Sequence, residues 1–221
     1  MPVLEAQLEA SPTRLRGIRH MLCWDASGLQ CVRTLPPPGL LLDATFREGF
    51  ACLQRYGLSF EAWLYYAQLP DLIDLARAFP EITIVLNHIG GPLGTGPYAG
   101  YRAAVFKSWQ HYIASLATCP NVVVKLGGLG MPACGFGWHE RPVPPGSAEL
   151  AEAMKPYYLW CIEQFGVERC MFESNFPVDK ISYSYGVLWN AFKLLVADLS
   201  PGEKTALFHD TAVRTYRLTA G

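Results

Sequence analysis

The sequence predicts an α/β protein with parallel strands, of the (β/α) barrel type. Apolar strand segments alternate with helical segments along the chain, and continuously hydrophobic strands are typical of parallel sheets. Connections from helix to strand are as short as "YG" and "FP", whereas those from strand to helix, at 90–100, 127–147 and 177–185, are long and rich in glycine and proline. In a (β/α) barrel the long loops follow the carboxyl ends of the strands, where active sites are built.

The predicted strands are apolar runs bounded by turn residues. They are 16–22, 58–65, 82–91, 121–130 and 169–177. A closed barrel of this class has eight strands, so five strands leave open the alternative of a doubly wound open sheet.

The predicted helices lie before, between and after these strands. Gly57 suits a helix end, Pro70 a helix start and Ser147 an N-cap, and Pro156 is expected to kink the helix that contains it. The segments are 3–10, 41–57, 70–80, 101–120, 147–166, 185–200 and 201–218.

Composition indicates one globular domain over residues 1–221. Apolar residues make up 51% of the chain and charged residues 17%, which allows a sizeable core. A formal charge of -1 without a run of Lys and Arg argues against nucleic acid and anionic membranes as partners. Apolar stretches are far shorter than the ~20 residues of a membrane span. The seven cysteines form no CxxC pair, which favours core thiols in a reducing, cytoplasmic setting.

Polar residues gather where the predicted strands end. The stretch "CMFESNFPVDK" places Glu173 and Asn175 after an apolar run, and His88 and Lys125 lie at the ends of two other strands. Carboxyl ends of parallel strands share one edge of a sheet, so these side chains are expected near one site.

Several stretches together resemble the amidohydrolase-related family of (β/α)8 TIM-barrel hydrolases, in the branch with dicarboxylate and sugar lactonases. The stretch "RGIRHMLCWD" resembles the fourth strand, and "LSFEAWLYYAQLPDLIDLARAFPEITIVLNHIGGP" the fifth and sixth. The stretch "NVVVKLGGLGMP" resembles the seventh strand and "RCMFESNFPVDK" the eighth. The resemblance implies a barrel truncated to strands 4–8, and the family's first-strand His-x-His pair is absent from the sequence.

The resemblance identifies His88 with the family's sixth-strand histidine, a metal ligand or catalytic group. Strand alternation from Ile84 and Leu86 is expected to point it into the barrel. Asn175 stands where the family has an aspartate, and an amide is neither a base at neutral pH nor a strong metal ligand. Glu173 is expected to supply the missing carboxylate. No cofactor is therefore expected, and a divalent metal such as zinc is left open but not favoured.

Arg19 and His20, at the end of the first strand, are predicted to bind substrate. A guanidinium suits bidentate recognition of a carboxylate, and the alternative is a structural ion pair with Glu173 or Asp25.

Four further residues are substrate-binding candidates. Trp24 and Trp63 are placed to wall a pocket, and Lys125 either enters the site or extends between helices. His139 lies in a loop expected to cover the barrel mouth. The stretches "GPLGTG" and "GGLGMPACG" lack a phosphate-loop signature and are interpreted as mobile lids.

The predicted function is hydrolysis of a small, carboxylated lactone or a related ester or amide. The missing His-x-His pair leaves open a non-catalytic barrel with a binding or assembly role, and a decarboxylase of the same superfamily is a further alternative. The expected partners are a small-molecule substrate and a second copy of the chain, through the unpaired edge of strand 16–22.

Overall fold

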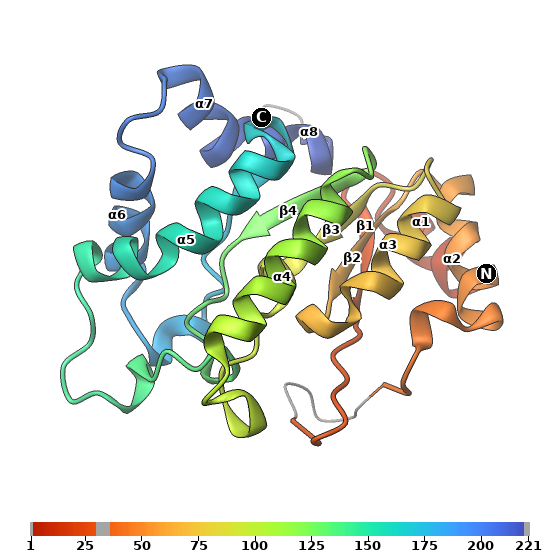
Figure 1. The fold of residues 1–221 in the computed structure, drawn as a ribbon. Helices are drawn as coiled ribbons and strands as arrows, with labels where there is room; N and C mark the ends of the chain where they lie inside the picture. The colour runs from red at the N-terminus through yellow and green to blue at the C-terminus, as the bar shows by residue number, and fades with distance from the viewer. Residues whose placement is uncertain (1, 30–35, 219–221) are drawn as a thin grey trace.

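A computed structural model describes residues 2–29 and 36–218, and its centre is a five-stranded parallel sheet (Figure 1). The strands pair in the order in which they occur in the chain. They are β1 Gly17–Met21, β2 Ser59–Trp63, β3 Ile84–Leu86, β4 Val122–Leu126 and β5 Cys170–Phe172. All four pairings are parallel, which confirms the prediction of a parallel α/β fold.

The sequential strand order decides between the two predicted architectures. A doubly wound sheet reverses direction at a switch point, so its strand order differs from its chain order. Here each crossover moves one strand further in the same direction, and right-handed crossovers then place the helices on one side. The doubly wound alternative is therefore wrong.

The helices agree with the predicted segments apart from their ends. They are α1 Pro2–Ala10, α2 Ala44–Arg55, α3 Leu69–Ala78, α4 Arg102–Ala117, α5 Ser147–Phe165, α6 Tyr185–Leu195, α7 Pro201–Thr205 and α8 Thr211–Tyr216. Helix α5 continues past Pro156. The last predicted helix is instead α7 and α8 separated by a π-helical turn, Ala206–Asp210.

The two faces of the sheet differ in chemistry because side chains alternate along each strand. The face toward the helices is apolar, and it includes Phe60, Ile84, Val124 and Phe172 in the buried core. In Figure 1, α3 and α4 lie in front of the sheet. The opposite face carries charged side chains, which are described with the candidate site below.

The two edges of the sheet differ in how far the rest of the chain covers them. Phe172 of β5 packs against Phe208 of the C-terminal π-helical turn, with ring centroids 4.8 Å apart. Residues 19–21 of β1, at the other edge, are exposed. Self-association through this edge stays a prediction.

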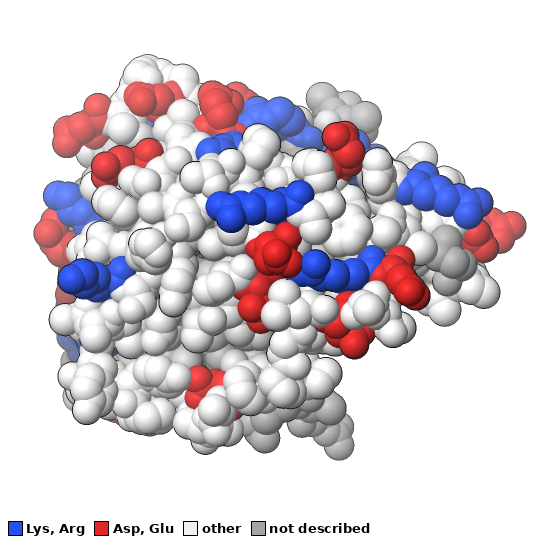
Figure 2. All heavy atoms as spheres, turned by 45° about the vertical axis from the view of Figure 1, so that its right-hand side comes forward, with Lys and Arg blue, Asp and Glu red and all other residues white. Residues whose placement is uncertain are grey.

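The surface is mixed in charge. On the face shown in Figure 2, Lys and Arg side chains are interspersed with Asp and Glu among a majority of other residues. No helix among the described residues is long and apolar enough to cross a membrane. The described cysteines are free thiols.

Asn121 joins the end of α3 to the start of β4. Its Nδ2 lies 3.1 Å from the carbonyl oxygens of Ala76 and Phe79 and 3.0 Å from that of Ile82. These carbonyls belong to the last turn of α3 and to the tight connection before β3, so a single side chain sets where two neighbouring strands begin.

We expect Asn121→Ala to lower the free energy of unfolding by about 1–3 kcal/mol, because it leaves partly buried carbonyl groups without a donor. Urea unfolding monitored by circular dichroism measures the change. The matched control is Asn190→Ala on the exposed side of α6, which should change the free energy by less than about 0.5 kcal/mol. Equal effects of the two substitutions would contradict the assignment.

Candidate functional site

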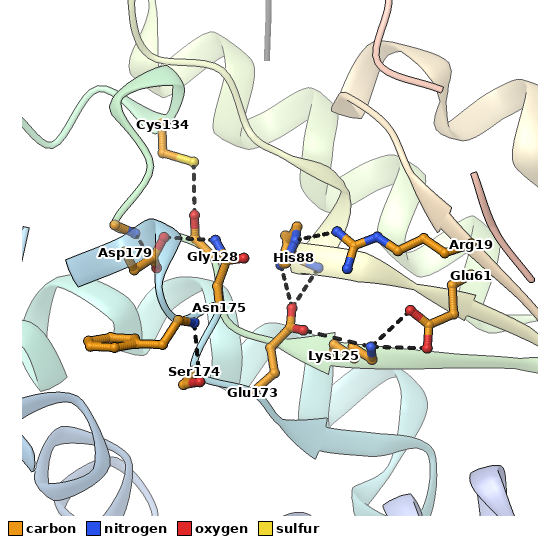
Figure 3. Close-up of polar contacts among 12 residues, drawn as sticks. Arg19, Glu61, His88, Lys125, Gly128, Cys134, Glu173, Ser174, Asn175 and Asp179 are labelled. Carbon is orange, nitrogen blue, oxygen red and sulfur yellow. Dashed lines mark hydrogen bonds and ion pairs between the residues drawn. The ribbon is translucent and has the colours of Figure 1, made fainter. Parts of the chain in front are cut away.

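His88 is the centre of a polar cluster on the charged face of the sheet (Figure 3). Its Nδ1 lies 2.5 Å from Oε1 of Glu173, and its backbone N–H donates to the same oxygen over 3.1 Å. Its Nε2 lies 3.2 Å from Nη2 of Arg19. A residue of β1 and the residue that follows β5 thus meet at the imidazole after β3, which is 3% exposed.

These contacts assign the His88 tautomer. A guanidinium only donates hydrogen bonds, so Nε2 must accept the bond from Arg19. The proton of a neutral imidazole is then on Nδ1, where it is donated to the Glu173 carboxylate. The nitrogen that faces Arg19 therefore carries a lone pair.

The direction of His88 is set by backbone conformation and not by strand alternation. Strand β3 ends at Leu86, and His88 has φ 55° and Ile89 φ 51°, both in the left-handed region. Leu86 and Ile84 are part of the core on the helix side, so the expectation that His88 shares their face is wrong. Gly128 makes room for the ring, because a Cβ there would lie 2.6 Å from the His88 Cβ.

A second group of charges lies beside Glu173 and is also built from strand residues. Lys125 of β4 donates to both carboxylate oxygens of Glu61 on β2, each over 3.1 Å, and its Nζ is 3.9 Å from Glu173. The Tyr216 hydroxyl of α8 donates to Glu61 over 2.5 Å. Lys125 therefore points into the site and not between the helices.

The pKa of Glu173 reflects this setting. Burial by itself raises it, but the charge that His88 carries when its ring is protonated, the hydrogen bonds from its ring and backbone, and the charge of Lys125 outweigh burial, so that the pKa is lowered. Glu173 is a carboxylate at neutral pH and can hold the His88 ring in one tautomer.

Asn175 belongs to a third group, which surrounds a buried carboxylate. Its Nδ2 donates to Oδ1 of Asp179 over 2.8 Å, and Asp179 also accepts from the Tyr183 hydroxyl at 2.7 Å and the Gly130 N–H at 3.1 Å. Burial raises the pKa of Asp179 to about 6, and the three hydrogen bonds oppose that shift. The folded state therefore holds this proton more tightly than the unfolded chain, so protonation of Asp179 stabilises the fold as the pH falls from about 6 toward 4.

Four side chains of these groups, those of Glu61, Asp179, Tyr183 and Tyr216, were not among the sequence candidates. Glu61 is a charged residue within the apolar run "LSFEAWLY", and this pattern could have identified it as a site candidate from the sequence. Asp179 and Tyr216 carry no comparable signal, because one lies beyond a proline-containing turn and the other in the last helix.

His20 is a correction to the predicted site. It alternates with Arg19 on β1 and therefore points to the helix side, where its ring stacks on Phe46 of α2 at 5.9 Å between centroids. Burial lowers the pKa of His20 there. It packs against a helix and does not join the polar cluster.

The other candidates are placed as follows. The Trp63 ring packs edge-on against His88, with centroids 4.6 Å apart, so Trp63 walls the site. Trp24 is half-buried, and its backbone N–H donates to Gln68. His139 lies in the loop before α5 with its Nε2 3.6 Å from Glu140. Among the described residues, these contacts of Trp24 and His139 lie outside the cluster.

The glycine-rich stretches are packed segments. Residues 90–94 and 127–131 are buried, and Gly130 is bonded both to Asp179 and, through its carbonyl, to the Ser182 hydroxyl. The backbone of these buried residues supports the cluster, and the expectation that the two stretches form mobile lids stays a prediction.

The described residues contain no group of three or more His, Cys, Asp or Glu side chains arranged to hold a metal ion. His88 and Glu173 are the two potential metal ligands at the centre of the cluster, but they bind each other. The cationic groups of Arg19 and Lys125 lie next to them. This donor set fits a bound divalent cation poorly, because catalytic zinc commonly has three protein ligands.

The chain is similar to known proteins over nearly its whole length. The model of the amidohydrolase family matches residues 6–218. An uncharacterised protein of Sinorhizobium fredii is 38% identical over 203 residues, which are 92% of this chain and 61% of that protein. An L-fucono-1,5-lactonase of Burkholderia multivorans is 28% identical over 93% of this chain and 64% of its own length.

A solved structure supports the same relationship. An amidohydrolase from Burkholderia multivorans, crystallised with bound zinc, superposes with a TM-score of 0.79 at 28% sequence identity. The match covers 99% of this chain and 70% of that one. The chain spans 61% and 64% of the length of the two curated relatives named above.

We expect Tyr183→Phe to raise the pKa of Asp179 further above about 6, because the lost hydroxyl donates to the carboxylate and favours its charged form. Carboxyl ¹³C shifts followed between pH 4 and 8 measure this pKa. The matched control is Tyr185→Phe at the exposed start of α6, which should leave it unchanged. A pKa that falls or stays constant in Tyr183→Phe would show that the hydroxyl is not bonded to the carboxylate.

Proposed function

Because the chain belongs to the amidohydrolase family, we propose that it is a hydrolase that opens a small, carboxylated lactone or a related ester or amide. The observation that carries the proposal is the Glu173–His88 pair, in which the lone pair on His88 Nε2 accepts a hydrogen bond from the guanidinium of Arg19. This combination provides a base beside a group that recognises carboxylates.

In the proposed reaction His88 is the general base. Glu173 holds the proton on Nδ1, so Nε2 accepts a proton from water as the water oxygen bonds to the lactone carbonyl carbon. The ring C–O bond then breaks, and the proton on Nε2 passes to the departing alkoxide. The product is a hydroxy acid, and the imidazole returns to its starting tautomer.

Arg19 orients the substrate in this scheme. Its guanidinium belongs to an exposed residue and binds His88 through Nη2, which leaves further N–H groups for a substrate carboxylate. Binding that carboxylate draws the guanidinium from Nε2 and uncovers the lone pair that water needs. Substrate binding and activation of the base are thereby coupled.

Lys125 and Glu61 act through Glu173. Lys125 balances the carboxylate that His88 needs, and Glu61 with Tyr216 fixes the position of the ammonium. An unpaired carboxylate at this depth would be costly and would tend to take up a proton. A protonated Glu173 would no longer favour the Nδ1–H tautomer.

The relatives support the reaction class. The B. multivorans relative is an L-fucono-1,5-lactonase, and a further relative from Scheffersomyces stipitis, 26% identical over 79% of this chain, is an L-rhamnono-gamma-lactonase. Lactone opening is common to both. A carboxylated substrate is the part of the proposal that rests on Arg19 alone.

We also propose that the sheet corresponds to strands 4–8 of a (β/α)8 barrel. Its sequential parallel order and the TM-score of 0.79 with the amidohydrolase structure support this assignment. A crystal structure of the chain in which β1 superposed on any strand but the fourth of a complete barrel would contradict it.

For catalysis, we expect His88→Ala to lower kcat/KM for lactone opening by about 10²–10⁴-fold, because a positioned general base contributes about that factor. The assay follows acid release from L-fucono-1,5-lactone and from 2-pyrone-4,6-dicarboxylate. His209→Ala is the matched control, because that imidazole is 69% exposed near the C-terminus. Undiminished turnover in His88→Ala would exclude His88 as the base.

For specificity, we expect Arg19→Met to raise KM about 10- to 100-fold for the carboxylated pyrone and much less for the uncharged lactone, because a charge-assisted hydrogen bond is lost. Arg77→Met on the exposed face of α3 is the control. Equal losses on both substrates would assign Arg19 to His88 alone and would remove the carboxylate from the proposal.

For metal content, we expect purified protein to contain far less than one zinc per chain and to be insensitive to chelators. The reason is the poor fit of the His88–Glu173 pair and its neighbouring cations to a zinc ion. Elemental analysis tests this expectation. A stoichiometric zinc that is lost on His88→Ala substitution would reverse it.

A further inference from the structure

The carboxylate of Asp179 is enclosed and accepts hydrogen bonds on both oxygens. The residue is 0% exposed. Its Oδ2 accepts from the Tyr183 hydroxyl and the Gly130 N–H, and its Oδ1 accepts from Nδ2 of Asn175. Each partner is a donor, which is what a buried carboxylate requires.

This arrangement leaves Asn175 one orientation. A side-chain amide donates only through its nitrogen, and a carboxylate only accepts, so the nitrogen must face Asp179. The amide oxygen then points elsewhere, and Figure 3 shows it on the side of His88. The backbone adds rigidity: Asn175 has φ 53°, and its carbonyl accepts from the Asp179 N–H over 3.1 Å.

The same geometry explains why residue 175 is an amide. An aspartate at this position would bring a second carboxylate within hydrogen-bonding distance of Asp179, and one of the two would have to take up a proton. Asparagine keeps the shape of aspartate and supplies the donor that Asp179 needs.

We propose that Asp179 is a positioning residue that fixes the Asn175 amide with its oxygen toward His88, so that the site presents a hydrogen-bond acceptor to an O–H group. That group is a hydroxyl of the lactone or the attacking water. The identity of the O–H group rests on the proposed function, whereas the orientation of the amide does not.

Asp179→Asn should reverse the polarity of the site. The new amide would use its oxygen for Tyr183 and Gly130 and would turn its NH2 group toward Asn175. Asn175 would then present its oxygen to residue 179 and its own NH2 group to His88. The substitution at residue 179 thus replaces the amide oxygen that faces His88, a hydrogen-bond acceptor, by the NH2 group, a donor. Residue 175 itself is unchanged.

The test is NMR on the whole ligand-free chain. The NH2 signals of Asn175 are identified by their loss in Asn175→Ser. In the wild type they should show Overhauser contacts to the Asp179 Hβ protons, and exchange with water about tenfold or more slowly than those of exposed Asn190. In Asp179→Asn the contacts should move to the His88 ring.

Tyr183→Phe is the matched control, because it removes a bond from Asp179 Oδ2 and leaves the bond to Asn175 at Oδ1. At a pH above the raised pKa of Asp179, the Asn175 NH2 group of this variant should keep the wild-type Overhauser contacts to the Asp179 Hβ protons. Contacts of the wild-type NH2 group with the His88 ring would overturn the proposal, even if Asp179→Asn fails to fold. Unchanged contacts in a folded Asp179→Asn would also overturn it.

Kinetics distinguish the two sources of the O–H group. If a substrate hydroxyl binds Asn175, Asp179→Asn should lower kcat/KM about 10-fold or more for a hydroxylated lactone and leave the corresponding deoxy lactone nearly unchanged. If the attacking water binds there, both should fall together. The absence of any lactone turnover in the wild type would count against the proposed function, and the NMR result would still decide the role of Asp179.

Discussion

The structure at the strand ends depends on the need to neutralise the carboxylate of Glu173. Taking a carboxylate out of water costs several kcal/mol unless donors and opposite charge surround it. Residues from two neighbouring strands meet that need here: His88 follows β3 and donates from its ring and its backbone, and Lys125 on β4 provides the charge. Arg19 on β1 then binds the other side of the imidazole. One buried charge thereby determines the tautomer of His88 and, through it, the contact with Arg19, whereas Glu61 and Tyr216 set the position of Lys125.

Asp179, six residues after Glu173 in the chain, is a second buried carboxylate that needs hydrogen-bond donors. Its donors are neutral groups. Tyr183, Gly130 and Asn175 supply hydrogen bonds without positive charge, which is consistent with the raised pKa of Asp179, in contrast with the lowered pKa of Glu173. Burial raises the pKa of both carboxyl groups, and only at Glu173 do the neighbouring donors and charges outweigh it. The backbone of the loop after β4 serves both, since Gly128 packs on the His88 ring and Gly130 binds Asp179.

The fold was largely predictable because hydrophobic periodicity and loop length are local properties. Each predicted strand and helix has a counterpart, and the parallel arrangement follows from the alternation of the two. Part of the site was predictable for a related reason, since polar residues that end parallel strands share an edge. That rule identified Arg19, His88, Lys125 and Glu173, which the structure brings together. It failed for His20, because alternation on β1 sends that side chain to the helices.

The sequence by itself determined the strand and helix segments, the family, and the presence of polar groups after the strands. Only the tertiary structure decided which of these groups meet and in what protonation state. His88 reaches the site through left-handed backbone that a two-residue period does not describe. Asn175 acquires its orientation from Asp179, and Glu61 acquires a partner from Tyr216 at the far end of the chain. Such contacts join residues through space, and the energy of burying a charge depends on all of its neighbours at once.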